Sequence, residues 1–223
     1  PNLKADAGYD PVADFAPVTQ MATVNFGFVA HAAFAPSTIP EFIAHARANA
    51  GKVDFASGGP GSPQHMGMEL FMWKAGVRLN HIPYRGVTPA FNDVVAGHVP
   101  TMILGFPAPI PFVQSGKLKM LAVTAARRSR NFPDVATVAE SGLPGYEAVL
   151  WQGYFVPAGT PREIITRLNA ELLKVINLPD FKQRIEVDAV EPIGSTPEQL
   201  SAVMRVELPK WAKVVKAAGI VAR

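Results

Sequence analysis

The side chains that could do acid–base or metal chemistry in this chain are five histidines and a small number of carboxylates, with no cysteine. Lack of cysteine excludes disulfides, thiolate zinc sites and cysteine nucleophiles. No histidine belongs to an H-E-x-x-H segment, so the sequence does not favour a metal site. No G-x-S-x-G segment marks a serine nucleophile. The residue types therefore predict no nucleophile–base set, no metal and no cofactor.

A glycine-rich loop offers a different chemistry, the binding of an anion. Residues 53–71, VDFASGGPGSPQHMGMELF, read as a short strand, a loop without bulky side chains, and a helix. Ser62 is predicted to cap this helix, and Pro63 falls at its first position, where a missing N–H costs nothing. The N–H groups at a helix start favour negative charge, so the loop predicts an anion site.

A second stretch repeats this arrangement. Residues 81–99, HIPYRGVTPAFNDVVAGHV, read as the end of a buried strand, a tight turn and a helix. Thr88 is the predicted cap and Pro89 the first helical residue. If the two strands are parallel, both helices begin at the same sheet edge, where open α/β sheets bind ligands. The alternative is that Ser-Pro and Thr-Pro are ordinary helix starts with no ligand.

Two titratable side chains within these stretches, His65 and Asp93, have two interpretations each. His65 lies one turn into the first helix, where it could contact a carboxylate or be a satisfied core or surface histidine. Asp93 lies in the second helix, where it could orient the loop or bind an ammonium group. Neither loop is a nucleotide site, because the Walker A ending and the dinucleotide glycine spacing are both missing.

The elements that must position these loops alternate between short apolar strands and capped helices, a pattern that predicts a mostly parallel α/β protein. A long amphipathic helix is predicted over residues 161–176, and its inward face is expected to carry Ile164, Ile165, Leu168, Leu172 and Val175. The 223 residues are only 17% charged, against about 25% in an average domain. The net charge of +3 is not organised into basic and aromatic clusters, which argues against nucleic-acid binding. No run of about 20 apolar residues predicts a membrane span.

Six strings distributed along the chain resemble the solute-binding proteins of the tripartite tricarboxylate transporter family, the Bug or TctC-type receptors of bacteria. Two of them are the stretches above. The others are YDPVADFAPVT (9–19), GKLKMLAVT (116–124), FPDVATVAESGLPGYE (132–147) and WQGYFVPAGTP (151–161).

The resemblance implies a two-lobe periplasmic binding protein of type II, like a Venus flytrap, with a mostly parallel sheet flanked by helices in each lobe. Residues 26–149 would form the second lobe. Residues 1–25 and 150–223 would be the remainder of the first lobe, because family members begin with a further N-terminal segment that this sequence does not contain.

The resemblance also implies that the ligand is an organic anion, a di- or tricarboxylate, an acidic amino acid or an aromatic carboxylate, passed on to membrane transporter subunits. His65, discussed above, joins the site residues carried over from the family, which are Ser57, Gly61, Ser62, Tyr84, Gly86, Thr88, Pro89, Ala90, Asp93 and Phe106. The expected function is that of a periplasmic receptor and not of an enzyme. The alternative is an enzyme or a signalling sensor that acts on small carboxylates.

Overall fold

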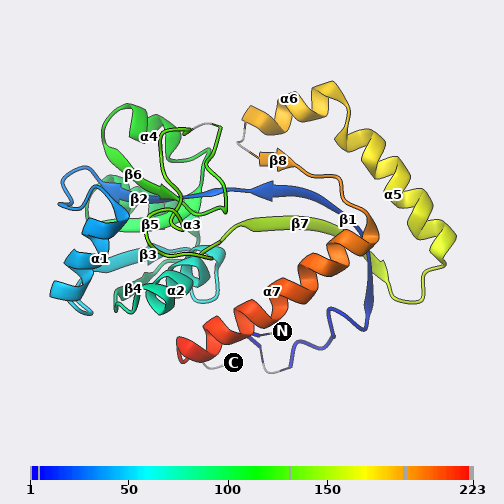
Figure 1. Ribbon diagram of the computed structural model, residues 1–223, viewed down its shortest axis with the longest axis horizontal. Helices are drawn as coiled ribbons and strands as arrows, with labels where there is room; N and C mark the ends of the chain where they lie inside the picture. Colours follow the sequence, from blue (N-terminus) through cyan, green and yellow to red (C-terminus); the bar gives the residue numbers. More distant parts are fainter. Residues whose placement is uncertain (1, 5, 131, 188–189, 221–223) are drawn as a thin grey trace. The chain divides into compact units, whose positions relative to one another are not determined.

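The computed structural model describes residues 2–4, 6–130, 132–187 and 190–220, and it divides into two compact units (Figure 1). The continuous unit is Asn25–Leu150. The discontinuous unit combines Pro1–Val24 with Trp151–Arg223. None of the described helices combines the length and the hydropathy that a membrane crossing requires.

The continuous unit is built on a five-stranded sheet with the strand order β4-β3-β5-β2-β6. Short loops connect its strands to helices, as the sequence pattern predicts. In chain order the elements are β2 (Phe26–His31), α1 (Ile39–Ala48), β3 (Asp54–Ser57), α2 (Pro63–Ala75), β4 (Asn80–Pro83), α3 (Val87–Val95), β5 (Thr101–Gly105), α4 (Ile110–Gln114) and β6 (Leu118–Val123).

The α/β prediction is confirmed, but the sheet is mixed and not mostly parallel. Strand β3 is parallel to β4 and β5, whereas β2 is antiparallel to both of its neighbours, β5 and β6. Parallel neighbours are tied in direction by the helical crossover that joins them. Strand β2 follows β1 (Phe15–Val24) with no helix between, so no preceding crossover fixes its direction.

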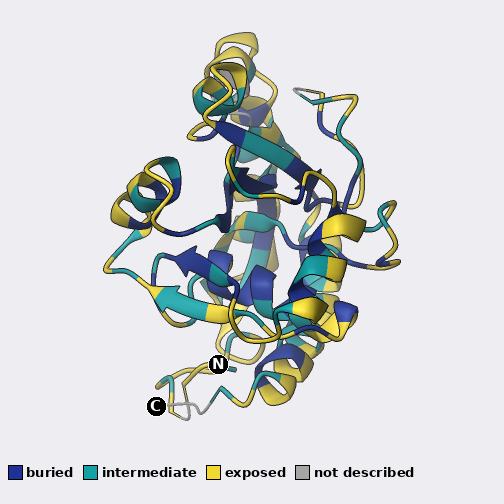
Figure 2. Cartoon of the chain, turned by 90° about the vertical axis from the view of Figure 1, so that its left-hand side faces the viewer, coloured by how far each residue is buried: buried dark blue, intermediate teal, exposed yellow. Residues whose placement is uncertain are grey.

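Helices cover both faces of this sheet, because successive residues of a strand point to opposite sides. On one face Phe28 meets Phe42 of α1 and Phe71 of α2, with ring centroids 4.9 and 5.1 Å apart. On the other face α3 contributes to an apolar cluster of Val29, Ala56, Ala90, Phe91, Val94, Val99, Met102, Leu104 and Leu118. Strand β2 is accordingly buried over most of its length (Figure 2).

The discontinuous unit has a three-stranded sheet, β7-β1-β8, in which β1 and β8 are antiparallel. Its elements besides β1 are β7 (Leu150–Pro157), α5 (Arg162–Ile176), α6 (Pro179–Val187), β8 (Val190–Pro192) and α7 (Pro197–Ala217). Helix α7 begins with a complete capping box between Thr196 and Gln199. The inward face predicted for α5 is correct only in part. Ile165 and Leu172 are half-buried, whereas Ile164, Leu168 and Val175 are 49%, 38% and 46% exposed.

Candidate functional site

The two loops singled out in the sequence follow adjacent parallel strands and lie against each other. Phe55 of β3 is in register with His81 of β4, so both loops leave the sheet at the same edge. The Gly86 N–H donates to the Gly58 carbonyl at 3.3 Å. A Cβ at Gly58 would lie 3.1 Å from Val87 Cγ2, so this approach needs a glycine. The two loops are therefore neighbours at one edge of the sheet, joined by a hydrogen bond.

Helix α2 begins as predicted, with Ser62 as its cap. The Ser62 hydroxyl accepts the His65 N–H at 3.4 Å, and the Met66 N–H donates to the Ser62 carbonyl at 2.9 Å. Pro63 has no N–H. Of the first helical residues, Gln64 therefore carries an N–H that precedes the first intrahelical bond, and this group is available to an anion or to water.

Helix α3 begins two residues earlier than predicted, so the assignment of Thr88 as its cap is wrong. The cap is Gly86, with φ 117° and no side-chain cap bond, and the first helical residue is Val87. Glycine tolerates this positive φ, so the chain turns into the helix sooner than the Thr-Pro signal suggests. The N–H groups of Val87 and Thr88 precede the first intrahelical bond, and Pro89 carries none. The exposed Thr88 adds a hydroxyl beside them.

Tyr84 and Asp93 join the second loop to α3. The Tyr84 hydroxyl donates to Asp93 Oδ2 at 2.6 Å, and His98 Nδ1 lies 3.2 Å from Asp93 Oδ1. The bonds from Tyr84 and His98 lower the pKa of Asp93, while burial and the Asp93 carboxylate raise the pKa of Tyr84 to about 12. Of the two roles considered for Asp93, this geometry matches the one of orienting the loop.

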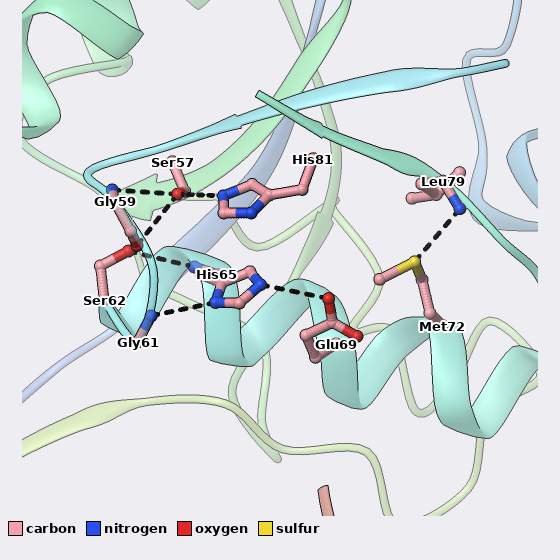
Figure 3. A network of polar contacts seen from close by, with 9 residues as sticks. All are labelled: Ser57, Gly59, Gly61, Ser62, His65, Glu69, Met72, Leu79 and His81. Atoms are coloured by element: carbon pink, nitrogen blue, oxygen red, sulfur yellow. Dashed lines mark hydrogen bonds and ion pairs between the residues drawn. The ribbon is translucent and has the colours of Figure 1, made fainter. Parts of the chain in front are cut away.

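His65 is buried, and the protein occupies both of its ring nitrogens (Figure 3). The Gly61 N–H donates to Nδ1 at 3.0 Å, and Nε2 lies 3.2 Å from Glu69 Oε1. Of the two interpretations of His65, the satisfied histidine fits this geometry. Its influence on a ligand would pass through the Gly61 backbone.

The structure brings together one hydroxyl and one imidazole that the sequence did not pair. Ser57 Oγ lies 2.6 Å from His81 Nε2, a contact made by the parallel register of β3 and β4. Ser57 is fully buried, and its Oγ also accepts the Gly59 N–H at 3.1 Å. Burial, followed by the charge of His65, lowers the pKa of His81 to about 4. A buried hydroxyl bonded within its own loop is placed to hold the loop and not to attack a substrate.

Three further residues lie beneath this surface. Ala90 and Phe106 are both fully buried, and the Phe106 ring packs 5.6 Å from that of Phe132. A direct ligand contact for either one stays a prediction. Sequence reasoning missed Gln64, which is 7% exposed and whose Oε1 has no hydrogen-bond partner among the described residues. Its position directly after Ser62-Pro63, at the start of the helix, could have identified Gln64 from the sequence.

Within the described part of the chain, no three histidine or carboxylate side chains gather closely enough to hold a metal ion. At the two helix starts the structure presents main-chain N–H groups and the hydroxyls of Ser62 and Thr88. Such groups at a helix start favour a carboxylate or another small anion.

Known proteins resemble the chain over most of its length. It is 37% identical over 208 residues to a Pseudomonas sp. (strain P51) protein encoded in the tcbD–tcbE intergenic region, which covers 93% of this chain and 62% of that relative. The chain thus spans less than two thirds of this relative's length.

Solved structures share the fold. An R. palustris protein with adipate superimposes with a TM-score of 0.84 at 31% identity, covering 99% of this chain and 74% of the other. The periplasmic binding protein BugD gives 0.84 at 32% identity, covering 100% and 75%. MatC from Rhodopseudomonas palustris, with bound malate, gives 0.80 at 28% identity, covering 96% and 74%. These matches confirm the periplasmic-binding-protein fold.

The sequence pattern of the tripartite tricarboxylate transporter family receptor matches residues 1–220. Matched along nearly all of its length, the chain belongs to the tripartite tricarboxylate transporter receptor family.

Proposed function

We propose that this chain belongs to a periplasmic receptor that binds an organic carboxylate and delivers it to a tripartite tricarboxylate transporter in the membrane. The continuous unit would be the second lobe of this receptor, and the discontinuous unit would belong to the first. The family membership supports the role. The ligand class is supported by two structural relatives, which are an adipate complex and a malate complex.

The observation that carries the proposal is the convergence of two helix starts at one sheet edge. The N–H groups of Gln64, Val87 and Thr88 precede the intrahelical bonds of α2 and α3, and they belong to loops joined by the hydrogen bond from Gly86 to Gly58. Each helix start carries partial positive charge without a titratable cation, so it attracts a carboxylate over a wide pH range.

The competing function is an enzyme or a sensor that acts on small carboxylates, and the Ser57–His81 contact is the feature that favours an enzyme. Titration calorimetry with adipate, malate and benzoate, followed by NMR of the incubated mixtures, separates the two. Binding with the ligand recovered unchanged supports the receptor. Conversion of the ligand, abolished by Ser57→Ala, would overturn it.

Two substitutions test the assigned loops. Thr88→Ala should weaken binding of the preferred carboxylate by about 1 kcal/mol, or roughly fivefold in Kd, through the lost hydroxyl. It should leave the free energy of unfolding unchanged, because Thr88 makes no cap bond. Ser62→Ala should weaken binding and also cost about 1 kcal/mol of stability, since its cap bond is lost.

Ser115→Ala is the matched control, because Ser115 is an exposed serine at the end of α4 whose hydroxyl donates to the Phe112 carbonyl. It should change neither the affinity for the carboxylate nor the free energy of unfolding. An unchanged affinity after Thr88→Ala would remove that residue from the site.

A further inference from the structure

Two imidazoles and a phenylalanine ring form a stack beneath the glycine-rich loop. His65 of α2 and His81 of β4 lie with ring centroids 4.0 Å apart and planes 9° apart. Phe55 of β3 continues the stack, 4.8 Å from His81. Three elements that share no local sequence thus meet under residues 57–62, and Figure 3 shows both imidazoles directed at this loop.

The hydrogen bonds of His65 require one neutral tautomer. Because the Gly61 N–H donates to Nδ1, that nitrogen must lack a proton. The ring proton then lies on Nε2, facing the Glu69 carboxylate. A proton added at Nδ1 would face the Gly61 N–H, and the bond that holds the loop would be lost.

His81 holds the other end of the loop through Ser57. The Ser57 hydroxyl contacts His81 Nε2, accepts the Gly59 N–H and lies 3.2 Å from the Gly59 carbonyl. Gly59 has φ 120°, and a Cβ there would lie 3.1 Å from the Tyr84 carbonyl. The loop conformation is therefore set by this contact and by a backbone shape that glycine tolerates.

Resting on the proposed function, we infer that His65, His81 and Glu69 are positioning residues, whose side chains hold residues 57–62 in the carboxylate-binding conformation through the Gly61 amide and the Ser57 hydroxyl. The groups that face the pair are Glu69 from α2, Ser57 and Phe55 from β3, and the Gly61 amide. Two imidazoles at this separation repel each other when both are charged. Consistent with this, burial and the charge of His65 hold the pKa of His81 near 4.

The sign of the pH effect follows from the direction of that shift. A histidine with an ordinary pKa of 6.5 that falls to about 4 binds fewer protons in the folded chain than in the unfolded one. Its contribution to stability is complete above pH 6.5 and is lost as the pH falls toward 4.

Two substitutions of His65 separate positioning from simple packing. His65→Asn places an amide oxygen where Nδ1 was, so it accepts the Gly61 N–H and does not titrate. His65→Phe keeps an aromatic ring in the stack but accepts nothing. If the hydrogen bond positions the loop, His65→Asn binds adipate more tightly than His65→Phe at pH 7. If the ring only fills space, the order is reversed, and the inference fails.

A ligand-free measurement distinguishes failure of this inference from failure of the proposed function. In ¹⁵N NMR spectra of the imidazoles at pH 7, His65 should be the Nε2–H tautomer, and the Gly61 amide shift should change more in His65→Phe than in His65→Asn. The Nδ1–H tautomer, or an equal change of the Gly61 shift in the two variants, would overturn the positioning role. If the tautomer and this difference hold while adipate, malate and benzoate all fail to bind, the positioning of the loop stands and the carboxylate function falls.

Discussion

Helix α2 in the continuous unit and helix α5 in the discontinuous unit are buried in opposite ways. Buried side chains of α2 lie on nearly every side of the helix, and Phe71 meets Phe28 and Phe42 at its centre. Helix α5 has a clear apolar face, yet within the described chain only its last residue, Ile176, is buried. The half-buried residues of α5, which are Ile165, Asn169, Leu172 and Leu173, still lie on the same side of the helix as Ile176. The two helices therefore differ in how completely the rest of their unit covers them.

Hydrogen bonds hold α5 in its unit, whereas packed aromatic rings hold α2. Asn169 Nδ2 donates to the Val18 and Ser195 carbonyls, both at 2.8 Å, and so ties α5 to β1 and to the segment before α7. The Thr19 hydroxyl also donates to the Ser195 carbonyl at 2.8 Å. In a unit with a small apolar core, a helix can be held in place by hydrogen bonds that buried carbonyl groups accept. The comparison implies different sensitivities to substitution in the two units.

The largest effect is expected for Phe71→Ala in the continuous unit. Removing a fully buried ring that touches Phe28 and Phe42 should cost about 3–5 kcal/mol of stability. Urea denaturation monitored by circular dichroism measures this. A cost below about 1 kcal/mol would mean that the unit repacks around the cavity, and the contrast with α5 would fail.

An intermediate effect is expected for Asn169→Ala in the discontinuous unit. The Val18 carbonyl would lose a donor in a buried setting, so the cost should be about 1–3 kcal/mol. Hydrogen exchange should show faster opening of α5 while the amides of α2 keep their protection. Equal acceleration in both helices would show that the units do not respond separately.

The smallest effect on stability is expected for Ile164→Glu on the exposed face of α5. A side chain that is 49% exposed contributes little to folding, so the free energy of unfolding should change by less than about 0.5 kcal/mol. Self-association at high concentration, measured by sedimentation velocity, should decrease because an apolar patch is interrupted. A large loss of stability would show that this face is covered in solution.

Much of the local structure could be predicted because its causes lie within a few residues. Ser62 followed by Pro63 marks the start of α2, since the cap and the first position are neighbours in sequence. Alternating strands and helices predicted the α/β class for the same reason. The start of α3 was harder to predict, because both Gly86 and Thr88 are plausible caps in the sequence. The choice of Gly86 depends on the residues packed around them.

The sequence by itself determined the start of α2 and the absence of thiol chemistry, because these depend on residue type and close spacing. Only the tertiary structure placed Ser57 against His81 and His65 beneath Gly61, since these contacts require β3 and β4 to pair in parallel with one register. It also left part of the predicted inward face of α5 exposed. Periodicity tells which face of a helix is apolar, while burial depends on whether another layer of the fold lies over that face.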